Sequence, residues 1–289
     1  WENLYRPADP DGFGVVTVVD MDIDADARFT AVGVVAEPGL IYSSTGALYL
    51  TDTNYDWQSN ARTTTDIYKF KYEGRGATPV AFGSVPGRIL NQYSMSEHNG
   101  NLRVATTIDA SWFFDETTGT GGQTAESSNN VYVLGQADSA LNVVGKIENI
   151  APGETIQSAR FMGDRGYVVT FLQVDPLFTV DLADPANPKL IGQLKVPGFS
   201  TFLTPIDANH VLAVGQYIPP PETPGNWGVQ LSIFDVTDFA NPTLKSNVVL
   251  GADANTSAYS EALWDPKALT YFAEGGVVAL PMSIYEYTY

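Results

Sequence analysis

The chain is built from short apolar runs that alternate with polar turn residues. Residues 160–198, RFMGDRGYVVTFLQVDPLFTVDLADPANPKLIGQLKVPG, contain four such runs with a turn signal between each pair. Gly, Pro or Asn-Gly interrupts the apolar pattern at short intervals, so no window has the periodicity of a long amphipathic helix. Strand-favouring Tyr, Phe and Val are frequent beside these turn residues. The pattern therefore predicts an all-β protein with many short strands.

A Pro-Gly marker recurs at the end of every fourth apolar run. Its glycines are Gly39, Gly87, Gly153 and Gly198, and a divergent VLG ends at Gly251. The successive glycines lie 48, 66, 45 and 53 residues apart, which is the length of a four-stranded propeller blade. The repeat predicts a β-propeller of four-stranded blades, with strands a to d of each blade following one another along the chain.

These markers divide the chain into blades of a single β-propeller domain over residues 1–289. Four complete blades are expected at 40–87, 88–153, 154–198 and 199–251, between partial blades at 15–39 and 252–289. Two arrangements remain open. The C-terminal strands complete the N-terminal blade in a five-bladed ring, or the chain is a fragment of a larger ring. The last strand, YEYTY, favours the fragment, because a five-bladed closure leaves no vacant place for it.

Long segments of the chain resemble secreted bacterial and archaeal proteins that carry a C-terminal β-propeller domain, distantly similar to WD-type repeats. The segments are VPGRILNQYSMSEHNGNLRVATT, NNVYVLG, IAPGETIQSARFMGDRGYVVTFLQVDPLFTVDLADPANPKLIGQLKVPGFSTFLTPID and AYSEALWDPKAL. The resemblance covers about residues 66–282. It implies export, a propeller fold and no established enzymatic activity, and it brings no catalytic motif.

The composition narrows the class of partner. Asp and Glu number 33 against 15 Lys and Arg, giving a net charge of -18. Such a surface repels phosphate backbones and anionic lipid, so nucleic acid is not an expected partner, while basic partners are favoured. No apolar run is long enough to span a membrane, so no transmembrane segment is expected. The chain has no cysteine, which excludes disulfides and thiolate chemistry.

Three long connections, all between strands b and c of a blade, carry aromatic residues that we expect to be exposed. They span residues 51–65, 107–130 and 216–228, and propeller geometry places such connections on one face. Flat amphipathic rings on loops are typical of surfaces that bind proteins or sugars. Alternatively, each ring folds back and covers its own loop. The expected partner-binding residues, including one in the linker after the fourth blade, are Tyr55, Trp57, Trp112, Phe113, Phe114, Trp227 and Trp264.

The innermost strand of each blade contributes a second candidate set. Alternation along strand a directs every second side chain toward the central channel. The expected channel-lining residues are Ser94, Ser96, Ser158, Arg160 and Thr204.

Calcium is the one cofactor that the acidic segments suggest. Asp20, Asp22 and Asp24 imitate the start of a calcium loop, but Ala25 and Ala31 replace its glycine and bidentate glutamate. The simpler interpretation is a solvated acidic hairpin. A second acidic loop contains Asp115 and Glu116. The expected cofactor is therefore none, or Ca²⁺ held by one of these groups.

Three functions are compatible with the sequence. The first is an exported, non-catalytic binding or scaffold protein, secreted or at the cell surface, that presents the Trp-bearing loops to a protein or an extracellular glycan. The second is an extracellular hydrolase or lyase with carboxylates on the face that carries the long connections, with or without a bound Ca²⁺. The third is a self-assembling subunit of a surface filament or layer, in which unfinished blade edges pair with a neighbouring chain.

Overall fold

The structure is a computed structural model, and nearly all of its regular structure is β-strand. Outside the strands, the described residues form three short 3-10 segments, η1 (Gln92–Ser94), η2 (Glu261–Leu263) and η3 (Pro266–Ala268), and no α-helix. Among them, no helix could cross a membrane. The chain divides into two compact units, Trp1–Pro152 and Gly153–Tyr289. The described residues are 4–6, 14–21, 29–37, 39–55, 63–74, 76–115, 117–172, 175–219, 225–253 and 255–287.

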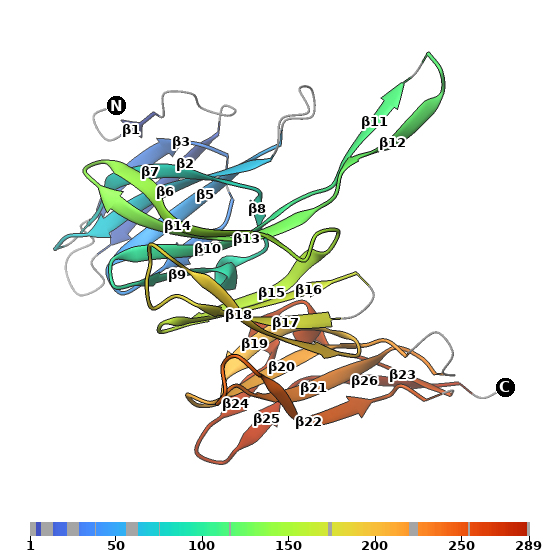
Figure 1. The fold of residues 1–289 in the computed structure, drawn as a ribbon. Helices are drawn as coiled ribbons and strands as arrows, with labels where there is room; N and C mark the ends of the chain where they lie inside the picture. Colours follow the sequence, from blue (N-terminus) through green and yellow to red (C-terminus); the bar gives the residue numbers. More distant parts are fainter. Residues whose placement is uncertain are drawn as a thin grey trace. The chain divides into compact units, whose positions relative to one another are not determined.

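The first unit begins with a three-stranded sheet (Figure 1). Strand β2 (Val15–Met21) lies antiparallel to β3 (Phe29–Val35), and β1 (Leu4–Tyr5) adds to β3 in parallel. The next four strands follow in sequence order, each antiparallel to the one before. They are β4 (Ile41–Ser43), β5 (Ala47–Asn54), β6 (Thr64–Tyr72) and β7 (Ala77–Pro86).

The following strands join this sheet instead of forming a separate one. They are β8 (Arg88–Ile89), β9 (Met95–His98), β10 (Asn101–Ile108), β13 (Ser128–Ala137) and β14 (Ala140–Ile150). Strand β14 pairs with β7 in parallel, which gives one nine-stranded sheet across the boundary expected at 87/88. The amide of Phe82 donates to the Ser139 carbonyl at 3.0 Å. Gly83 allows this approach, since a Cβ there would lie 2.3 Å from the Leu141 carbonyl oxygen.

The second unit contains two four-stranded antiparallel sheets, each with its strands in sequence order. The number of blades in the whole molecule stays a prediction. The strands of the first sheet are β15 (Thr155–Met162), β16 (Arg165–Phe171), β17 (Asp175–Asp181) and β18 (Lys189–Val196). Those of the second are β19 (Phe199–Pro205), β20 (His210–Tyr217), β21 (Gly228–Asp235) and β22 (Thr243–Leu250).

The C-terminal segment, expected as a partial blade, does not pair its strands in sequence order. The segment from Glu261 to Ala268 forms η2 and η3, where the side chains of Ser260 and Asp265 cap the two turns. A short hairpin of β24 (Thr270–Phe272) and β25 (Val277–Ala279) follows. The last strand, β26 (Ser283–Glu286), returns to pair antiparallel with β23 (Thr256–Tyr259).

Sheets in each unit bury both of their faces, which explains why central strands are apolar at consecutive positions. In β5, Tyr49 packs toward β10 and β13, whereas Leu50 on the opposite face packs toward β3. In β20, Val211 and Val214 likewise belong to different clusters. Fully burying such a side chain contributes about 1.5–3 kcal/mol, so the sheets are held mainly by their faces.

Four of the five marker glycines share one backbone conformation. Gly87, Gly153, Gly198 and Gly251 have φ of 88°, 83°, 80° and 64°, in the left-handed region that side chains disfavour. A Cβ at Gly87 would lie 2.7 Å from the Thr107 carbonyl oxygen on β10, and one at Gly198 would lie 2.4 Å from that of Gln216 on β20. At Gly87 and Gly198 the repeat therefore marks the point where one segment turns back against a strand of the next.

Candidate functional site

An exposed aromatic hairpin is the most distinctive surface feature of the first unit. It consists of β11 (Ser111–Asp115) and β12 (Thr120–Ala125) and stands in the connection between β10 and β13. In Figure 1 it extends away from the ends of those strands. Trp112, Phe113 and Phe114 are 66%, 49% and 71% exposed. We refer to residues 111–125 as the aromatic hairpin.

Opposed glycines explain how three large aromatic residues fit on so narrow a ribbon. Phe113 lies opposite Gly122, and Phe114 lies opposite Gly121. A Cβ at Gly122 would lie 3.2 Å from Cε1 of Phe113, and one at Gly121 would lie 3.0 Å from Cδ2 of Phe114. The rings thus cover the bare backbone of β12, an arrangement known to stabilise glycine-containing strands.

Asp115 forms the turn of the hairpin. Its Oδ1 accepts hydrogen bonds from the amides of Thr117 at 2.8 Å and Thr118 at 3.4 Å, and the Gly119 amide donates to its carbonyl at 2.9 Å. These hydrogen bonds favour the ionised form and lower the pKa of the Asp115 carboxyl. The carboxylate thus closes the loop as an Asx turn, and it needs no metal to account for its position.

The other predicted calcium ligands do not form a cluster with it in the described parts of the chain. Asp20 lies on β2 opposite Thr30. Asp22, Asp24 and Glu116 lie outside the described residues. Within the described ranges, no group of three His, Cys, Asp or Glu side chains could hold a metal ion. Calcium binding stays a prediction.

A bidentate ion pair anchors the root of the hairpin. Nε of Arg88 on β8 donates to Oδ2 of Asp109 at 2.9 Å, and its Nη2 donates to Oδ1 at 3.0 Å. Residues 107–130 contain no Lys or Arg of their own, so this distant arginine is the partner for the acid that precedes the hairpin. Its fork geometry fixes the point from which the hairpin departs.

The remaining predicted partner-binding residues lie at other places. Tyr55 is exposed just beyond β5, and Trp57 lies outside the described residues. Trp227, just before β21, and Trp264, after η2, are exposed side chains of the second unit. The described tryptophan rings therefore do not fold back over their loops. That all these connections share one face stays a prediction.

Most of the predicted channel-lining residues are buried or hydrogen-bonded within the fold. Ser94 belongs to η1, not to a strand, and is fully buried. Ser96 accepts a hydrogen bond from Nη2 of Arg103 at 2.8 Å. The buried hydroxyl of Ser158 donates to the Ser200 carbonyl at 2.8 Å, which links β15 to β19. Arg160 on β15 and Thr204 on β19 are half-buried, and a channel lined by this set stays a prediction.

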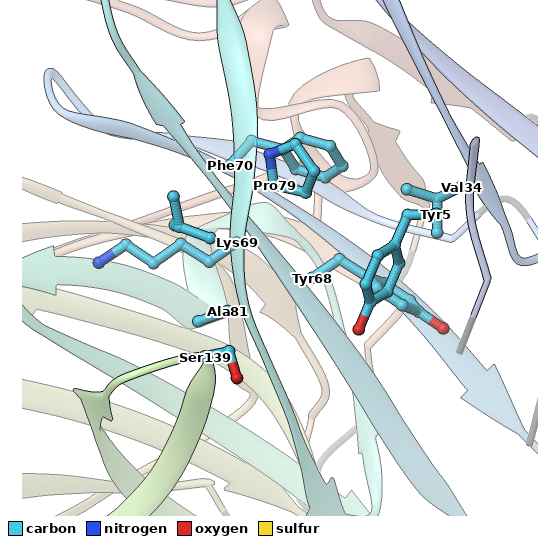
Figure 2. Close-up of a pocket in the computed structure, with 9 residues that line it drawn as sticks. Tyr5, Val34, Tyr68, Lys69, Phe70, Pro79, Ala81 and Ser139 are labelled. Carbon is cyan, nitrogen blue, oxygen red and sulfur yellow. The ribbon is translucent and has the colours of Figure 1, made fainter. Parts of the chain in front are cut away.

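A small pocket in the first unit is aromatic but too small for a substrate. It lies between Tyr5, Val34, Tyr68, Phe70 and Pro79 and has a volume of about 70 Å³ (Figure 2). The rings of Tyr5 and Tyr68 meet edge to face, with centroids 6.4 Å apart. Sites for small molecules usually enclose at least about 300 Å³, so this pocket is a gap of the packing.

A buried ion pair was not evident from the sequence. Nζ of Lys69 on β6 lies 3.4 Å from Oε1 of Glu97 on β9, with side chains 10% and 15% exposed. Ser44 donates to the other Glu97 oxygen, and the Glu97 amide donates to the Tyr42 hydroxyl at 2.9 Å. Burial and the neighbouring carboxylate raise the pKa of Tyr49. Because these hydrogen bonds already engage Glu97, we assign the ion pair a structural role.

The comparisons with known proteins cover all or most of the chain. A family model described as beta propeller domain matches residues 1–289. An uncharacterized protein of Archaeoglobus fulgidus is 42% identical over 198 residues, which is 68% of this chain and 27% of the relative. One from Methanocaldococcus jannaschii is 40% identical over 195 residues, 67% of this chain and 28% of the relative. The matched part thus spans little more than a quarter of each relative.

Solved structures give a weaker match. Two structures of the Synechocystis apocarotenoid oxygenase, one of a mutant and one of the cobalt-substituted enzyme, both have a TM-score of 0.47 and 11% sequence identity. Each match covers 82% of this chain and 55% of the oxygenase. This similarity is too low to relate the chemistry of the two proteins.

Proposed function

Because the chain belongs to the β-propeller domain family, we propose that it is a binding module that holds a partner protein on the aromatic hairpin. The observation that carries the proposal is the exposure of Trp112, Phe113 and Phe114 on a ribbon anchored to a nine-stranded sheet. Aromatic side chains are enriched among the residues that dominate binding energy, because a rigid ring contributes a large contact area at a small entropic cost.

The energetics of the hairpin support the same assignment. A two-stranded ribbon is marginally stable in water when it packs on nothing, and its exposed rings gain about 25 cal/mol for each Å² that a partner covers. Large exposed aromatic groups on a soluble protein are typical of interaction sites. Export, which the resemblance to secreted propeller proteins implies, would give the hairpin access to extracellular partners.

The test compares the full chain with variants of its exposed aromatic residues. Immobilised wild-type chain is expected to retain a partner protein from fractions of the source cells. The double variant Trp112→Ala/Phe114→Ala is expected to lose at least about tenfold in retention, because two central aromatic contacts are removed. The thermal unfolding midpoint should stay within about 2 °C, since both rings are exposed and contribute little to the core.

Phe29→Ala is the matched control, because Phe29 is also an exposed phenylalanine of the first unit but lies on β3. This variant should retain the partner as the wild type does. Equal retention by the double variant, or its unfolding at a much lower temperature, would overturn the assignment of the hairpin as the contact surface.

A further inference from the structure

We infer that the aromatic hairpin binds a basic, extended segment of its partner, which adds as a third strand to the ribbon. This inference rests on the proposed function and names the chemistry of the partner. Among the described residues, β11 and β12 pair only with each other, so each strand has one edge free of strand pairing. Free edges are the sites at which extended peptides add to sheets.

The edges of the hairpin lack the usual protection. Natural edge strands are guarded by lysine, proline, bulges or inward-pointing charges, which prevent another strand from pairing. Residues 111–125 contain no Lys, Arg or Pro. The one irregularity in the pairing lies at the root, between Ser111 and Trp112. Along β12, Gly121 and Gly122 carry no side chain that could keep an approaching backbone away. An edge left open in this way suits strand addition.

Alternation along β11 defines what the added strand would contact. Trp112 and Phe114 are two residues apart and therefore lie on one face of the ribbon, and Phe113 lies on the other. A strand added at the free edge of β12 would set its own alternate side chains beside these rings, because the rings of Phe113 and Phe114 lie over Gly122 and Gly121 of β12. Lysine and arginine bind well to the faces of tryptophan and phenylalanine, and apolar residues pack on the ring edges.

Charge selects a basic segment and disfavours a second copy of this chain. Residues 107–130 contain four acidic residues, Asp109, Asp115, Glu116 and Glu126, and no basic residue. Arg88 pairs with Asp109, which leaves three of them to attract a basic segment. The whole chain has a net charge of -18. Two such hairpins would repel one another, whereas a strand rich in Lys or Arg gains electrostatic attraction along its approach.

Three synthetic peptides of about seven residues separate charge from strand addition. Two of them alternate Lys with Val and Glu with Val, and the third, called the Lys-Pro peptide, repeats Lys-Lys-Pro-Pro. The Lys-Pro peptide keeps the basic charge but places proline on both edges of an extended strand, so it cannot form a continuous ladder of hydrogen bonds, because proline has no amide hydrogen. With the full chain in calorimetric titrations, we expect the Lys-Val peptide to bind at least tenfold more tightly than the Lys-Pro peptide. The Glu-Val peptide should not bind, and 0.5 M salt should weaken the Lys-Val complex.

A variant with a lysine on the edge strand β12 tests the site on the protein. Gln123→Lys places a lysine on β12 and should weaken Lys-Val binding at least tenfold without changing the unfolding midpoint. Gln136→Lys is the matched control, because Gln136 is an exposed glutamine at the end of β13, and it should leave binding unchanged. Equal effects of the two variants would show that net charge alone matters, and would overturn strand addition.

The remaining outcomes separate this inference from the proposed function. If Trp112→Ala/Phe114→Ala loses the cellular partner but the Lys-Val and Lys-Pro peptides bind equally, strand addition is wrong and the binding module stands. If the double variant keeps both the partner and the Lys-Val peptide, both proposals fail. A dimer in sedimentation that disappears in the double variant would replace the basic segment by a second copy of the chain. Binding of a neutral oligosaccharide and no peptide would replace it by a glycan.

Discussion

Replacing Gly198 by alanine is expected to lower the free energy of unfolding of the second unit by about 2–6 kcal/mol. Two costs combine at this position. The backbone has a φ of 80°, where a side chain is strained by about 1–3 kcal/mol. The added Cβ would also lie 2.4 Å from the Gln216 carbonyl oxygen, and displacing packed backbone costs about 1–3 kcal/mol more. Urea unfolding of the full chain measures the loss.

Two other glycines separate these costs. Gly163 has a φ of 54° but nothing within 4 Å of an added Cβ, so Gly163→Ala should cost only about 1 kcal/mol. Gly46 has open space and no left-handed φ, so Gly46→Ala should change stability by less than about 1 kcal/mol. If Gly198→Ala costs no more than Gly163→Ala, the close approach does not explain the Pro-Gly repeat.

Replacing Lys69 by methionine is expected to lower the free energy of unfolding of the first unit by about 3 kcal/mol. The substitution keeps an unbranched side chain only one atom shorter but leaves the Glu97 carboxylate buried without its cation, which typically costs about 3–5 kcal/mol. Glu97→Gln should be costly for the reciprocal reason. The double variant Lys69→Met/Glu97→Gln should lose much less than the sum of the two single losses, because it leaves no unpaired charge.

Lys71→Met is the control for this pair. Lys71 lies 2.9 Å from Glu73, closer than Lys69 lies to Glu97, but these side chains are 58% and 53% exposed. Water screens such a pair, so its loss should cost less than about 1 kcal/mol. Similar losses for Lys69→Met and Lys71→Met would show that burial does not decide the strength of the inner pair.

Strand-level features with a local cause could be predicted from the sequence. The apolar runs and Pro-Gly marks in 154–251 correspond to the eight strands β15–β22, because turn glycines and alternating side chains act over a few residues. The β-propeller family inferred from the quoted segments is confirmed over residues 1–289. Export, by contrast, stays a prediction.

Features with a long-range cause could not be predicted. The pairing of β7 with β14 depends on Gly83 meeting Leu141, and the buried ion pair joins Lys69 to a residue 28 positions away. Nothing in the local sequence of either partner identifies the other. The return of β26 to β23 has the same character, since it depends on residues on both sides of η2 and η3.

The aromatic hairpin is an intermediate case. Trp112, Phe113 and Phe114 were predicted as partner-binding residues of a loop, but the loop folds into β11 and β12. A local signal was present. Three consecutive aromatic residues favour a strand, the Asp-Glu-Thr-Thr-Gly segment is a turn sequence, and the two following glycines accept the rings.

Photo-crosslinking from the hairpin tests the central claim most directly. A photoreactive phenylalanine analogue is placed at position 114 or, in a matched sample, at position 29, and each full chain is irradiated with the partner preparation. The account predicts a covalent adduct with one partner protein from position 114 and none from position 29, with the crosslink in a basic segment of that partner. An adduct of equal yield from both positions, or a partner that binds the chain without reacting at position 114, would contradict it.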